Sequence, residues 1–133
     1  MSWIEDEAAR QATFRANLSE AWAALKAALA RDIADYRKHF GLHDVETKER
    51  GDDGYWIMFQ EGTDRLSGRR DIHVTIDFEK LRLTVAITQT RTKQDFKVVP
   101  DANGFPVFER LGKRYSVDEV SREILKPHLS KVG

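Results

Sequence analysis

The 133-residue sequence contains no cysteine, which excludes disulfide bonds, thiolate zinc sites, iron–sulfur clusters and cysteine nucleophiles. It also lacks an excess of either charge: 22 Lys and Arg stand against 22 Asp and Glu, so no net charge attracts nucleic acid or an anionic membrane. No apolar stretch is long enough to span a bilayer, because the longest, 21–30, is mostly alanine and contains Lys26. The sequence therefore predicts no membrane partner and disfavours nucleic acid as a partner.

The first residues include Glu5, Asp6 and Glu7, where a signal peptide carries positive charge. We therefore expect a cytoplasmic protein. The alanine and arginine content of its first forty residues is compatible with a bacterial source. The length fits a single domain, residues 1–133, which is large enough to form a hydrophobic core without a metal or a disulfide bond.

A long amphipathic helix is predicted at the N-terminus. Ser2 and Glu5 have the spacing of a capping box, and Gly41 stands where a left-handed residue ends a helix. Between them, apolar residues recur every three or four positions in an eleven-residue repeat, which keeps them on one side of the helix. They are Phe14, Leu18, Trp22, Leu25, Leu29, Ile33, Tyr36 and Phe40. A helix over 3–40 is about 57 Å long, more than the width of such a domain, so its first turns project or pack on another chain.

After residue 42 the apolar period changes to two, which predicts antiparallel strands. The expected strands are 43–50, 55–61, 72–78, 81–88, 94–99 and 105–110. The glycine- and serine-containing segment 62–70 predicts a surface loop. A second capping box, Ser116 with Glu119, opens a short helix that Pro127 ends or kinks.

The hairpin of 72–78 and 81–88 has a defined register. A turn at 79–80 places Asp77 opposite Arg82 on the polar face, which is a favourable cross-strand pair. The other face then contains apolar pairs alone, so both faces support the same register. These pairs are Phe78–Leu81, Ile76–Leu83, Val74–Val85 and Ile72–Ile87.

Together the elements predict an α+β fold: a long N-terminal helix packed on a curved antiparallel sheet of five to six meander strands, followed by a short C-terminal helix. The apolar stripe of the long helix is the surface large enough to cover the apolar face of the sheet. In the order of its elements the arrangement resembles cystatin-like folds. The resemblance implies a fold and no function, because one fold serves many functions.

The residue patterns of active sites and metal sites are missing. The predicted inner face of the sheet is apolar, with no acid or base directed into a cavity. His39 and His43 are four residues apart, but Gly41 ends the helix between them, so they do not share a face. No Gly-rich phosphate loop, nucleophile elbow or zinc-protease motif occurs. The sequence therefore predicts no cofactor and no metal, and it favours a non-catalytic protein.

The segment 55–59 is apolar on both faces, which requires a covering layer on each side of the strand. That second layer is either the C-terminal helix or a partner subunit. The apolar residues at 3 and 4 likewise have little to pack against in a monomer. We therefore hypothesise a small binding or interaction module that forms a homodimer and contacts a protein partner. The candidate interface residues are Trp3, Ile4, Trp56 and Met58.

The alternative hypothesis is a small-ligand binding domain with a pocket between the helix and the sheet. Trp22 and Tyr36 would line this pocket. Arg65, Arg69 and Arg70, in the loop that begins a basic segment of the chain, would bind the head group of an acidic ligand. An apolar ligand is the other candidate for the same pocket.

Overall fold

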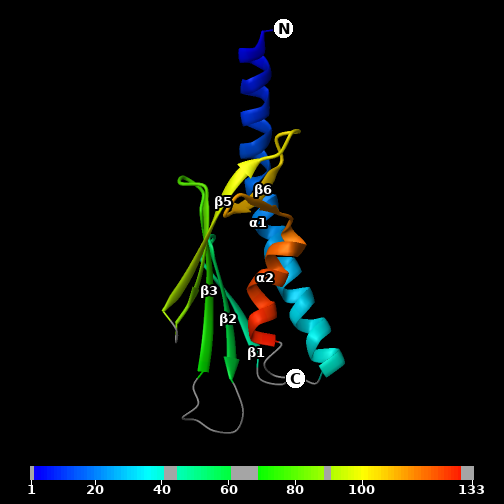
Figure 1. The fold of residues 1–133 in the computed structure, drawn as a ribbon, viewed down its shortest axis with the longest axis vertical. Coiled ribbons are helices and arrows are strands. Elements are labelled where there is room, and N and C mark those ends of the chain that lie inside the picture. Colours follow the sequence, from blue (N-terminus) through cyan, green and yellow to red (C-terminus); the bar gives the residue numbers. More distant parts are fainter. Residues whose placement is uncertain (1, 41–44, 61–68, 89–90, 130–133) are drawn as a thin grey trace.

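The computed structural model describes residues 2–40, 45–60, 69–88 and 91–129 (Figure 1). Helix α1 (Trp3–Phe40) is followed by seven strands and then by helix α2 (Val117–Leu129). The strands are β1 (Val45–Arg50), β2 (Gly54–Gln60), β3 (Arg69–Asp77), β4 (Arg82–Ile87), β5 (Thr92–Pro100), β6 (Pro106–Arg110) and β7 (Lys113–Tyr115). Each strand pairs antiparallel with the next in one sheet, so the predicted α+β fold with a meander sheet is confirmed.

Helix α1 is continuous over 38 residues. The backbone N–H of Glu5 donates to the Ser2 hydroxyl oxygen at 3.3 Å, as expected of an N-terminal cap. The apolar stripe from Phe14 to Ile33 is buried. The first turns extend beyond every other element (Figure 1), and there the side chains of Trp3 and Ile4 are 76% and 60% exposed.

The register between β3 and β4 matches the register expected from the sequence. Asp77 lies opposite Arg82 and Ile72 lies opposite Ile87. In the first hairpin Arg50 pairs with Gly54 across a three-residue turn. The expectation of an apolar inner face is therefore confirmed for these strands, whose inward residues Ile57, Ile72, Val74 and Leu83 are fully buried.

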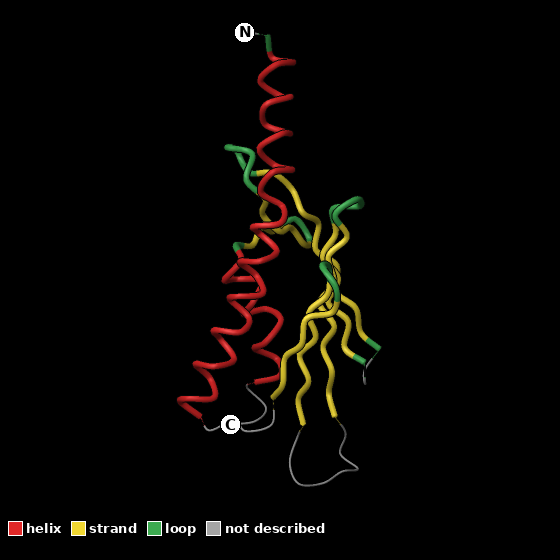
Figure 2. Tube along the Cα trace, turned by 180° about the vertical axis from the view of Figure 1, so that it is seen from behind, coloured by secondary structure: helices red, strands yellow, loops and turns green. Residues whose placement is uncertain are grey.

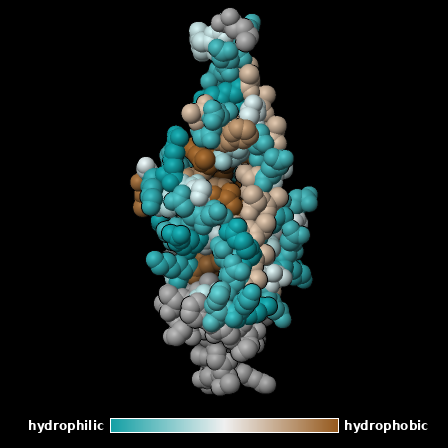
Figure 3. All heavy atoms as spheres, turned by 90° about the vertical axis from the view of Figure 1, so that its right-hand side faces the viewer, coloured by the Kyte–Doolittle hydropathy of each residue, from teal (hydrophilic) through white to brown (hydrophobic). Residues whose placement is uncertain are grey.

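Both helices lie on the same side of the sheet (Figure 2). The core joins the α1 stripe, the inner residues of the sheet, and Val120, Ile124 and Leu125 of α2. Seen from the helical side, the surface is largely hydrophilic, and its more apolar residues gather in the middle part of the molecule (Figure 3). Neither of the two described helices lies on the opposite face of the sheet (Figure 2).

Helix α2 begins at the predicted capping box. The Ser116 backbone N–H donates to the Glu119 carboxylate at 3.1 Å, and the Glu119 N–H donates to the Ser116 hydroxyl at 3.2 Å. The Ser116 backbone bond is the main reason that the pKa of Glu119 lies below its ordinary value, and the Ser116 side chain adds to the effect.

A polar contact fixes α2 against α1. The hydroxyl of Ser121, which is fully buried, donates to the Asp32 carboxylate at 2.6 Å. Arg31 contacts Asp118 at 2.8 Å and Asp32 at 3.3 Å. The hydrogen bonds to Asp118 and then Asp32 raise the pKa of Arg31 above its ordinary value, so its charge is permanent.

The structure differs from the sequence-based expectation at three places. The sheet has seven strands and not five or six, because β7 pairs with the end of β6 and three residues are too few for an alternating pattern to be evident. Arg69 and Arg70 begin β3 instead of belonging to a loop. Of the two alternatives at Pro127, an end of the helix is wrong, because α2 continues to Leu129; a proline in the last turn removes only one helical hydrogen bond.

Candidate functional site

The outer face of the sheet is the principal surface that the described helices leave uncovered (Figure 2). Most of its side chains are charged or hydroxylated, as on β4 and β5, where Thr84 donates to Asp95 at 2.9 Å. On β2 the outward residues are instead Trp56 and Met58, both half-buried. The C-terminal helix does not provide the second layer over this strand, because α2 packs on the inner side with α1, β6 and β7.

Trp56 forms the centre of a three-residue stack that crosses β1, β2 and β3. Its ring lies parallel to that of His73, its cross-strand neighbour, with centroids 3.8 Å apart and an interplanar angle of 13°. On its other side the guanidinium carbon of Arg50 is 4.0 Å from the ring centroid. Stacking and cation–π attraction therefore hold the indole in one orientation.

This stack limits the chemistry of the surface. Both faces of the indole are occupied, so Trp56 does not offer a free ring face on which a nucleic acid base could stack. The Nε2 atom of His73 is buried and has no hydrogen-bond partner among the described residues. The ring of His73 packs flat against the indole of Trp56.

The sequence alone points to Trp56 but not to its contact with His73. The register between β2 and β3 creates the contact, and the residues that connect these two strands, 61–68, lie outside the described residues. An aromatic residue opposite a histidine can be found from sequence only once the pairing of the two strands is fixed.

Strand β1 forms one edge of the sheet, since it pairs with β2 alone. Residues Glu46 to Arg50 are all exposed. Two α1 side chains reach this strand: Lys26 binds the Glu49 carboxylate at 2.6 Å, and Arg37 donates to the Val45 carbonyl at 2.6 Å. Between these two contacts no described residue pairs with the edge.

The residues expected to line a ligand pocket are not gathered into one described cavity. Trp22 is 3% exposed and its indole N–H donates to the Asp52 carbonyl at 3.0 Å. Tyr36 packs partly buried at the edge of the core. Arg69 and Arg70 lie on β3, with their side chains outside the described set, and Arg65 lies outside the described residues altogether. The ligand-pocket hypothesis stays a prediction.

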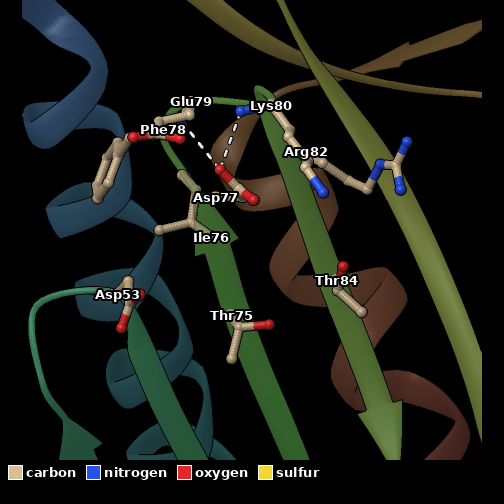
Figure 4. Close-up of a pocket in the computed structure, with 9 residues that line it drawn as sticks. All are labelled: Asp53, Thr75, Ile76, Asp77, Phe78, Glu79, Lys80, Arg82 and Thr84. Carbon is tan, nitrogen blue, oxygen red and sulfur yellow. Dashed lines mark hydrogen bonds between the residues drawn. The ribbon is translucent and has the colours of Figure 1, made fainter.

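An open depression of about 620 Å³ lies beside the turn between β3 and β4 (Figure 4). Three carboxylate residues, Asp53, Asp77 and Glu79, line it. Asp77 accepts the backbone N–H groups of Glu79 at 3.0 Å and Lys80 at 2.9 Å. The Lys80 bond is the largest cause of a pKa below the ordinary value for Asp77. Asp77 is therefore an ionised turn residue, which does not have the raised pKa of a general acid.

The described residues offer little for metal or membrane chemistry. Within 2–40, 45–60, 69–88 and 91–129, no three His, Asp or Glu residues lie together as a metal site requires. No helix in the described part of the chain combines the length and apolarity needed to cross a membrane.

Comparison with protein-family models, with curated proteins and with solved structures found no match to this chain. The surface that the sheet presents is therefore the feature that bears on function.

Proposed function

We propose that this protein is a non-catalytic interaction module of the cytoplasm that forms a homodimer. The observation that carries the proposal is the position of Trp56 and Met58: two large apolar side chains on a sheet face that neither helix covers. The proposed contact surface is the β1–β2 flank, defined as strand β1 together with the outward residues of β2.

The composition of the flank supports this proposal. Trp, Met and Arg are enriched in protein interfaces relative to the rest of the surface, and Trp56, Met58 and Arg50 lie together here. The stack also orders these side chains before any partner arrives. Association therefore has a smaller entropic cost than it has on a surface of freely rotating side chains.

The two other candidate interface residues, Trp3 and Ile4, are far along α1 from the flank (Figure 1). Their exposure of 76% and 60% supports a second, independent contact at the projecting end of the helix. The ligand-pocket alternative has less support, because the buried Trp22 already uses its only donor on Asp52.

A charged residue at the centre of the stack tests the proposal. Trp56→Glu should convert the dimer to a monomer, because it replaces the large apolar side chain of the proposed contact with a hydrated carboxylate and removes the ring on which Arg50 and His73 stack. The control is Lys97→Glu, which changes charge on β5 at the far side of the same face and should leave the dimer intact. Native mass spectrometry gives the oligomeric state, and circular dichroism confirms that both variants are folded.

A wild-type protein that is monomeric at all concentrations would contradict the proposal itself. A Trp56→Glu variant that dimerises as tightly as the wild type would contradict a contact through the outward residues of β2.

A further inference from the structure

Strand β1 has hydrogen-bonding groups available on its outer side. The Val45 carbonyl accepts from Arg37 of α1, so it is turned away from β2. Backbone groups alternate in direction along an antiparallel strand, so the N–H and C=O groups of Thr47 and Glu49 point outward as well. No described residue pairs with these groups at Thr47, which makes the centre of β1 a site where another strand can add.

Helix α1 leaves room beside this edge. Lys26 and Arg37 contact the two ends of β1, and Ala30 lies on the same side of the helix between them. Both Ala30 and the facing Thr47 are exposed, so the helix does not cover the centre of the strand. The exposed alanines of this side recur at intervals of four, three and four residues. They are Ala23, Ala27, Ala30 and Ala34.

We infer that a second copy of this chain pairs with β1 edge to edge, antiparallel, about a two-fold axis at Thr47. The inference rests on the proposed homodimer and specifies its geometry. In this register Glu46 of each copy lies directly opposite Lys48 of the other copy on the outer face. Because the axis is two-fold, the dimer contains two such Glu46–Lys48 pairs. Opposite charges at directly opposed positions stabilise a strand pair.

The charge pattern selects this register over its neighbours. Opposed residues in an antiparallel pair share a face, so the neighbouring registers in which the faces agree have their axes at Glu46 and at Lys48. Each places one charged residue against itself, which is repulsive. The register at Lys48 also places Glu46 opposite Arg50, but the Arg50 guanidinium is already stacked on Trp56. Charged side chains also protect an edge strand from indiscriminate pairing. The charges of Glu46 and Lys48 therefore disfavour pairing with unrelated strands. They are complementary to a second β1 when the two-fold axis lies at Thr47.

The arrangement of α1 is independently consistent with this axis. Thr47 is midway between the two positions of β1 that α1 contacts, Val45 and Glu49. On α1, the point midway between the two residues that contact β1, Lys26 and Arg37, lies between Ala30 and Ala34. A two-fold axis at Thr47 therefore brings the alanine stripes of two antiparallel helices toward one another. Small side chains permit such helices to pack closely.

Reversal of single charges tests the register. Glu46→Lys places two lysines opposite each other at both symmetry-related positions, and Lys48→Glu places two glutamates there. Each variant alone should dimerise about 10- to 100-fold more weakly than the wild type. A mixture of the two variants restores both attractive pairs, so it should form a heterodimer with near wild-type affinity. Native mass spectrometry resolves the heterodimer if one variant carries an isotope label.

Thr47→Pro provides a second test that does not depend on charge. Proline removes the outward N–H and places its ring where the partner strand approaches. Because the N–H of Thr47 does not bond to β2, the monomer should remain folded while the dimer is lost. Thr47→Val keeps the N–H and should dimerise like the wild type.

The outcomes separate the inference from the proposed function. Weak homodimers of both charge variants together with a strong heterodimer support the pairing at Thr47. If both charge variants and Thr47→Pro stay dimeric while Trp56→Glu is monomeric, the copies meet through the outer face, and the edge pairing is overturned while the proposed function stands. A mixture that stays monomeric overturns the register. A monomeric wild type overturns both proposals.

Discussion

At the residue scale, the contact between Ser121 and Asp32 shows how a buried polar group can be tolerated. Ser121 is 0% exposed, and a hydroxyl in that position is destabilising unless it has a partner. The Asp32 carboxylate provides one at 2.6 Å, and it remains one-third exposed so that its own charge stays solvated. The pair therefore specifies the position of α2 against α1.

The substitutions Asp32→Ala and Ser121→Ala should lower the free energy of unfolding by different amounts. Asp32→Ala leaves the buried Ser121 hydroxyl unpaired and should lower the free energy of unfolding by about 1–3 kcal/mol. Ser121→Ala removes the buried donor together with its need for a partner, so it should cost less, about 1 kcal/mol. Urea denaturation followed by circular dichroism measures both values. Equal and negligible losses would show that the pair contributes nothing to helix packing.

Asp77 predicts a dependence of stability on pH. Its pKa is held below the ordinary value of 3.8, first by the Lys80 backbone N–H. A carboxylate with a lower pKa in the folded state stabilises the fold when it is ionised. This stabilisation is complete above pH 3.8 and is lost as the pH falls through the lower pKa of the folded state.

The variant Asp77→Asn isolates this contribution. Its midpoint of urea denaturation should lie below that of the wild type at neutral pH, and the two midpoints should converge in acid. A constant difference across the whole pH range would contradict the role of the ionised carboxylate.

At the scale of the elements, two serines cap two helices with different consequences. Ser116 caps α2, which packs in the core through Val120 and Ile124. Ser2 caps the projecting end of α1, where the neighbouring Trp3 is exposed. Ser116→Ala should therefore cost about 1 kcal/mol of global stability. Ser2→Ala, which is the same substitution at the same kind of cap, should leave global stability unchanged because only a solvated helix end frays. Thermal denaturation of the two variants compares them directly.

Gly104 fixes the β5–β6 hairpin to α1. It adopts φ +90°, and a Cβ added there would lie 3.1 Å from the Arg10 carbonyl oxygen. Gly112, in the β6–β7 turn, adopts φ +78° with no heavy atom within 4 Å of such a Cβ. Both substitutions to alanine strain the backbone, but Gly104→Ala also pushes the hairpin away from the helix. Gly104→Ala should therefore lower the free energy of unfolding, measured by urea denaturation, more than Gly112→Ala does. Equal losses would contradict the close contact between Gly104 and Arg10 of α1.

The elements differ in how well the sequence predicts them. The eleven-residue repeat of α1 extends over many residues, and so does the agreement between the two faces of β3 and β4. The sequence therefore predicts both the helix and the register between these two strands. Strand β7 has three residues, and it exists because β6 offers a free edge, which is a tertiary effect. The start of β3 at Arg69 was missed for a similar reason: Arg69 and Arg70 break the alternation, but Gln60 and Phe59 of β2 pair with them.

At the scale of the whole molecule, both described helices lie on one face of the sheet, and no described helix covers the other face (Figure 2). The sequence indicated the apolar outer residues Trp56 and Met58 through strand alternation. It could not indicate the Arg50–Trp56–His73 stack, because that contact depends on the registers of two strand pairs. The open centre of β1 likewise follows from where α1 crosses the sheet, which no local pattern encodes.

The most direct test of this account is the mass of the wild-type protein in solution, measured by sedimentation velocity over a range of concentrations. The account predicts a reversible equilibrium with a species of twice the chain mass of 15.3 kDa. A single species of 15.3 kDa at every concentration, up to about 100 µM, would contradict the homodimer and the edge pairing together.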